Sequence, residues 1–124
     1  MPMELLEDGW LRQPDPEQIG TRCMPGIPRE EPTALIRKFA NFSTYAYQDK
    51  LNYAGYKNIP VSYLFCERDQ VLPPSLQQEG IDTVEKVSGN KVHVTRIQGD
   101  HCPNWTSEAE VLNWIVDMSH RSTV

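Results

Sequence analysis

The sequence contains no apolar run approaching the ~20 residues that cross a bilayer as a helix, so we expect no membrane span. Its first eight residues lack a basic segment followed by an apolar one, so no secretory signal is expected. Basic residues are fewer than acidic ones. The sequence has 12 Lys and Arg against 17 Asp and Glu, which gives a net charge of −5. A negative surface repels nucleic-acid phosphates and anionic lipids. We therefore expect neither nucleic acid nor a membrane as partner.

Cysteine is scarce. The three cysteines, Cys23, Cys66 and Cys102, are odd in number and lack the spacing of metal ligands. We therefore expect no metal ion at the cysteines, and no cofactor is expected. Reduced thiols in a cytoplasmic protein are the simplest interpretation, and a redox or thiol role is the alternative.

Regular structure is expected to be sparse near the N-terminus, where proline and glycine interrupt residues 1–28. An Asp8-Gly9 pair flanked by apolar residues predicts a tight hairpin turn. Residues 30–48 predict a helix with Pro32 in its first turn. A helical turn or loop is expected at 49–57. The apolar stripe of the predicted helix comprises Leu35, Ile36, Phe39, Phe42, Ala46 and Tyr47.

The second half of the chain predicts an α/β fold with the order β-α-β-α. The expected elements are a strand at 60–66, a helix at 74–87, a strand at 92–97 and a helix at 107–119 with an apolar face. A right-handed β-α-β crossover makes the two strands parallel. Both strands then end at the same edge of the sheet, which is where sites form in open α/β sheets.

Two titratable residues follow these strand ends. Asp69 lies in the loop after the first strand, and His101 lies in the loop after the second. An acid beside a histidine is two thirds of a Ser-His-Asp catalytic triad. Glu67 and Asp100 are competing acids. The structural alternatives are that Asp69 caps the turn that follows it and that His101 is an ordinary surface residue.

These same segments carry a family resemblance. The stretch I-P-V-S-Y-L-F-C-E-R-D-Q-V-L-P resembles the penultimate core strand and acid loop of an α/β-hydrolase, and V-T-R-I-Q-G-D-H-C-P-N-W resembles its last strand and histidine loop. Residues 59–118 therefore look like the C-terminal end of a small fungal or plant-type α/β-hydrolase. A histidine-loop motif of that group resembles residues 100–107, which read D-H-C-P-N-W-T-S.

The resemblance implies a division of the chain and a set of roles. Residues 1–58 would be a lid or cap-like segment, and 59–124 would be a truncated C-terminal α/β-hydrolase core unit. Asp69 would be the catalytic acid and His101 the catalytic base. The implied substrates are esters, lactones or other acyl compounds, and the implied setting is small-molecule (secondary metabolite) biosynthesis.

The chain departs from that family in its nucleophile. No Gly-x-Ser-x-Gly motif occurs in the 124 residues, so no nucleophile elbow is visible. Ser107 is better explained as a helix N-cap, and Cys102 adjoins His101 too closely in sequence to be aimed at it. A non-catalytic remnant that binds a ligand or a partner chain, and a truncated gene model of a complete hydrolase, are the alternatives to an active hydrolase.

Two expectations concern partners. Six aromatic residues could line a pocket for a small apolar acyl-type ligand, or could pack within the lid and core. A two-stranded sheet has edges that can pair with another chain, so a homodimer or a complex with another chain is expected. The aromatic residues are Trp10, Tyr45, Tyr47, Tyr53, Tyr56 and Trp105.

Overall fold

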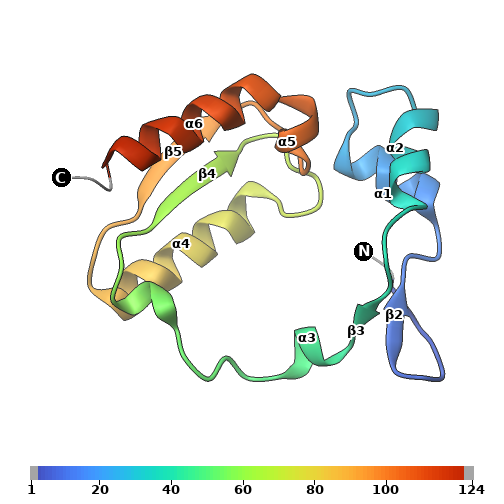
Figure 1. The fold of residues 1–124 in the computed structure, drawn as a ribbon, viewed down its shortest axis with the longest axis horizontal. Helices are drawn as coiled ribbons and strands as arrows, with labels where there is room; N and C mark the ends of the chain where they lie inside the picture. Colours follow the sequence, from blue (N-terminus) through green and yellow to red (C-terminus); the bar gives the residue numbers. More distant parts are fainter. Residues whose placement is uncertain (1–2, 122–124) are drawn as a thin grey trace. The chain divides into compact units, whose positions relative to one another are not determined.

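The computed structural model describes residues 3–121. They form two compact units, one that ends at Tyr53 and one that begins at Ala54 (Figure 1). Each unit has its own sheet. The first holds a three-stranded antiparallel sheet of order β1-β2-β3, and the second a two-stranded parallel sheet, β4-β5. The protein is therefore a mixed α/β structure. No helix among residues 3–121 combines the length and apolar character needed to cross a membrane.

The first unit begins with the predicted hairpin. Strands β1 (Glu4–Leu5) and β2 (Trp10–Arg12) pair around Gly9, whose φ of 81° lies in the left-handed region that favours glycine. The Leu6 N–H donates to the Trp10 carbonyl at 2.8 Å and closes the turn. The tight hairpin turn predicted at Asp8-Gly9 is thus confirmed.

The expectation of irregular structure before residue 28 is wrong for α1 (Pro16–Cys23). Asp15 caps this helix, because its carboxylate accepts from the Gln18 N–H at 3.0 Å. Pro16 occupies the first turn, where its missing N–H leaves no bond unmade. Helix α1 packs on α2 so closely that a Cβ on Gly20 would lie 2.8 Å from the Pro32 carbonyl carbon.

The predicted 30–48 helix is also wrong in extent. It is divided into α2 (Glu30–Ile36), strand β3 (Phe42–Ser43) and α3 (Tyr45–Gln48). Residues Phe42 and Ser43 pair instead with Leu11 and Trp10 of β2. Backbone pairing with a distant segment therefore overrides the local helical period.

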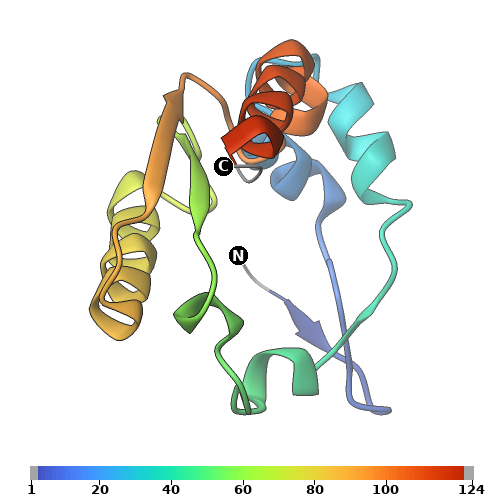
Figure 2. The same ribbon diagram turned by 60° about the vertical axis from the view of Figure 1, so that its left-hand side comes forward.

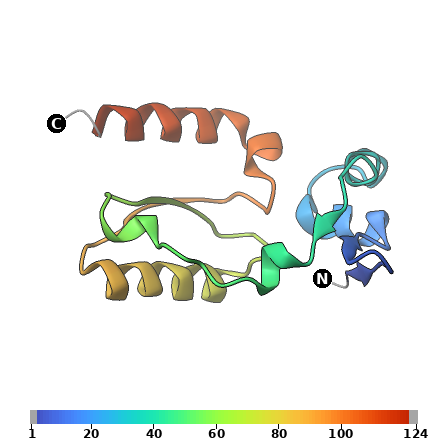
Figure 3. The same ribbon diagram turned by 60° about the horizontal axis from the view of Figure 1, so that its bottom comes forward.

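The second unit follows the predicted β-α-β-α order. After the 3₁₀ turn η1 (Gly55–Lys57) come β4 (Ser62–Cys66), α4 (Pro74–Ser88) and β5 (His93–Ile97). Helices α5 (Pro103–Thr106) and α6 (Glu108–Arg121) complete it. Figures 2 and 3 show α4 on one face of the β4-β5 sheet and α6 on the other.

The core of this unit lies between the sheet and α4. It is built on Phe65, Ile81 and Val92, which are all buried. The opposite face of the sheet, where α6 lies, is less covered. Leu112 and Ile115 of α6 are more than half exposed, so the apolar face expected of this helix is only partly covered.

Candidate acid–histidine site

The parallel register of β4 and β5 brings two loops together. Cys66 pairs with Ile97 at the last position of the ladder. Two backbone bonds then extend the pairing beyond the strands: the Glu67 N–H donates to the Ile97 carbonyl and the Arg68 N–H to the Gly99 carbonyl, both at 3.0 Å. The loops that carry Asp69 and His101 are therefore held side by side.

Asp69 and His101 are in direct contact. The Nδ1 of His101 lies 2.9 Å from Oδ2 of Asp69. The Asp69 side chain is only 6% exposed, whereas that of His101 is 35% exposed. A carboxylate can only accept, so in this contact Nδ1 carries the proton, and in the neutral ring Nε2 is then the free base. The predicted proximity is confirmed, and the catalytic roles stay a prediction.

Asp69 also caps its own loop. Its Oδ1 accepts from the N–H groups of Val71 and Leu72, both at 2.8 Å. The turn-capping alternative and the histidine contact are thus both present, each on a different carboxylate oxygen. Because one oxygen is fixed by two backbone donors, the other is aimed at His101.

Gln77 of α4 bonds to the same loop and was not identified from the sequence. The residue is 2% exposed. Its Oε1 accepts from the Cys66 N–H at 3.0 Å, and its Nε2 donates to the carbonyls of Cys66 and Leu72, both at 2.9 Å. A signal did exist: Gln77 precedes Ile81 by four residues and Val84 by seven, so a polar residue lies on the apolar stripe.

The two competing acids bind other groups. Asp100 is buried, and its Oδ1 accepts from the Cys102 N–H at 2.9 Å and from the Thr106 hydroxyl at 2.8 Å. This arrangement shapes the chain between β5 and α5. Glu67 pairs with Arg96 at 2.9 Å on the surface. Asp69 is therefore the acid that these loops present to His101.

Five of the six aromatic residues considered above as pocket or packing residues lie at the surface. Trp10, Tyr45, Tyr47, Tyr53 and Trp105 are each at least 45% exposed. The expectation of ordinary packing is therefore wrong for these five.

One of the three thiols, that of Cys66, has a raised pKa. Cys23, Cys66 and Cys102 are not joined in disulfides. Burial raises the pKa of the Cys66 thiol from 9.0 to about 11, and the nearby Asp69, Asp100 and Glu110 carboxylates raise it further in the same direction. Cys66 is thus held as the protonated, unreactive thiol. Within residues 3–121, no group of three or more His, Cys, Asp or Glu side chains is arranged to hold a metal ion.

The shift at Cys66 predicts a loss of stability in alkali. The unfolded thiol ionises near pH 9.0 and the folded one near 11, so stability is intact below pH 9.0 and falls across that interval. Tyr63, whose pKa is raised by burial and by Cys66 and Asp69, adds to the fall. Urea unfolding across this pH range measures it, and Cys66→Ala should make the fall shallower. An equally steep fall in that variant would contradict the assignment.

Comparison with known proteins gives a partial relationship. No protein-family profile matches the sequence. The chain is 39% identical over 80 residues to "Probable hydrolase R7" of Phoma sp. (strain ATCC 20986 / MF5453), a match that covers 64% of this chain and 33% of that protein. The chain therefore spans about a third of the length of this relative. The similarity supports a relationship to a hydrolase.

Proposed function

We propose that the chain supplies the acid and the histidine of an α/β-hydrolase site that acts on esters, lactones or other acyl compounds. The observation that carries the proposal is the 2.9 Å contact between His101 Nδ1 and the buried Asp69 carboxylate. The similarity to a probable hydrolase and the order acid loop then histidine loop, each after a parallel strand, support it. Residues 1–58 are the proposed cap-like segment.

In this proposal the two residues have different tasks. His101 Nε2 accepts a proton from the attacking group and returns it to the leaving group. Asp69 keeps the proton on Nδ1 and stabilises the imidazolium that forms. The nucleophilic serine of a complete triad comes from outside these 124 residues, which hold no Gly-x-Ser-x-Gly motif. In the chain alone, His101 instead activates water.

Hydrolysis of p-nitrophenyl esters by the purified chain tests the proposal. A positioned general base accelerates such a reaction by about 10²–10⁴-fold. We expect His101→Ala to return the rate to that of buffer, and His120→Ala, which removes an exposed imidazole of α6, to leave it unchanged. A fluorophosphonate probe should label no serine.

Two outcomes would count against the proposal. Equal rates for the parent chain and His101→Ala would favour the non-catalytic alternative, a unit that binds a ligand or a partner. Stoichiometric labelling of one serine would show that the nucleophile lies within the chain after all.

A further inference from the structure

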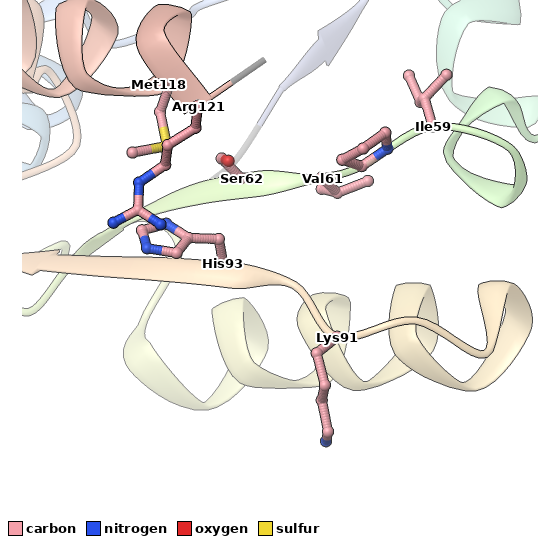
Figure 4. Close-up of a pocket in the computed structure, with 8 residues that line it drawn as sticks. Ile59, Val61, Ser62, Lys91, His93, Met118 and Arg121 are labelled. Carbon is pink, nitrogen blue, oxygen red and sulfur yellow. The ribbon is translucent and has the colours of Figure 1, made fainter. Parts of the chain in front are cut away.

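A second candidate site lies at the other end of the parallel sheet. A cavity of about 500 Å³ opens where β4 and β5 begin (Figure 4). Ser62 and His93, which are paired at the first position of the ladder, both line it, whereas Asp69 and His101 follow its last position. The volume falls within the range of small-molecule pockets. The other lining residues used below are Ile59, Val61, Met118 and Arg121.

The charged side chains that line this cavity are basic. Among residues 3–121 no Asp or Glu lines it, although the chain as a whole has a net charge of −5. Arg121 forms no ion pair with any other residue in 3–121, and Figure 4 shows its side chain extending toward His93. Lys91 is already paired with Glu85 at 2.6 Å, and its side chain points away from the cavity. The guanidinium of Arg121 is therefore the cation available to a ligand.

His93 supplies an unused polar atom. Its Nδ1 is buried and has no hydrogen-bond partner among the described residues. A buried polar atom without a partner costs free energy, so such atoms are rare in folded proteins. The His93 ring lines the cavity, so a rotation of the ring that uncovers this nitrogen would let a ligand oxygen become the missing partner. Across the cavity, Ile59, Val61 and Met118 offer apolar surface.

We propose that this cavity binds a small amphiphilic carboxylate. Arg121 receives the carboxylate in the two-bond geometry that guanidinium and carboxylate groups share. The imidazole of His93 bonds to the same head group, and Ile59, Val61 and Met118 contact the hydrocarbon chain. The proposal is independent of the acid–histidine site at the opposite end of the sheet.

Titration of ¹⁵N-labelled chain with hexanoate, followed by NMR, tests the proposal. We expect amide shifts centred on Ser62, His93 and Arg121. Arg121→Gln should weaken binding about tenfold or more, since it removes a charge-assisted pair, and Arg121→Lys should retain part of the affinity. Lys86→Gln removes an exposed charge of α4 outside the cavity and should change nothing. Thermal unfolding of each variant checks that it is folded.

Two further probes separate charge from apolar contact. Hexanamide has the same chain without the charge and should bind more weakly, and inorganic phosphate has the charge without the chain and should do the same. Equal binding of hexanamide, or an unchanged affinity in Arg121→Gln, would overturn the role of Arg121. Equal binding of phosphate would overturn the role of the apolar lining. Hexanoate shifts absent from the cavity residues would overturn the site itself.

Discussion

Replacing Asp69 by asparagine is expected to lower the His101-dependent rate of ester hydrolysis by about 10²–10⁴-fold, down to the level without a positioned base. The reason lies in the two oxygens of Asp69. Oδ1 accepts from the Val71 and Leu72 N–H groups. An asparagine keeps its amide oxygen on these two donors, and its NH₂ group then faces His101.

That NH₂ group donates where the carboxylate accepted. His101 Nδ1 must become the acceptor, so the ring proton moves to Nε2 and the free base is lost. The loop stays folded because its backbone donors keep their acceptor. The variant therefore separates tautomer control from loop structure, which Asp69→Ala would not do.

Rate measurements and the ¹⁵N shifts of the His101 ring together check this prediction. The matched control is Asp100→Asn, because Asp100 is also a buried loop acid but accepts from Cys102 and Thr106 rather than from the histidine. It should keep the parent rate. A full rate in Asp69→Asn, with the proton on Nε2, would show that the Asp69 contact does not control the base.

The second unit was predictable from the sequence because its signals are local and mutually consistent. Strand β4 and strand β5 are short β-branched or aromatic runs, and each of the two long helices has its own apolar period. The handedness of the crossover then makes the strands parallel and places Asp69 and His101 at one edge. The contact between them follows from topology rather than from any pairwise motif.

The first unit was less predictable because distant contacts determine it. The helical period across 30–48 is real, but residues Phe42 and Ser43 gain strand pairing with β2, which local spacing does not reveal. Helix α1 was not predicted because Pro16 lies in a segment that proline and glycine interrupt, although Asp15-Pro16 is a regular way to begin a helix. The role of Gln77 could not be predicted for a different reason. The hydrogen bonds of a buried side-chain amide depend on which backbone groups the tertiary fold leaves without a partner.

Replacing Gln77 by leucine is expected to destabilise the second unit by roughly 2–5 kcal/mol, a cost that reflects the backbone groups left without partners. Leucine fills similar space and suits the apolar stripe of α4, but it bonds to neither the N–H nor the carbonyl of Cys66. The Leu72 carbonyl loses its Nε2 donor as well. Urea unfolding measures the loss.

The adjacent Gln78 gives the matched control. Its side chain bonds to Asp82 and Arg96 in exposed contacts, which water can replace. Gln78→Leu should therefore change the free energy of unfolding by no more than about 1 kcal/mol. A loss for Gln77→Leu as small as this would show that water satisfies the Cys66 and Leu72 groups.

The Gln77→Leu substitution should also affect the candidate site, because Gln77 bonds to the loop that carries Asp69. Gln77 bonds to Cys66 and Leu72, the two ends of the segment that carries Asp69, and Leu72 also donates to Asp69 Oδ1. Freeing both ends lets the carboxylate move relative to His101, so folded Gln77→Leu protein should lose part of its His101-dependent rate. Gln78→Leu should lose none. A full rate in Gln77→Leu under conditions where it is folded would show that the strand register alone positions Asp69.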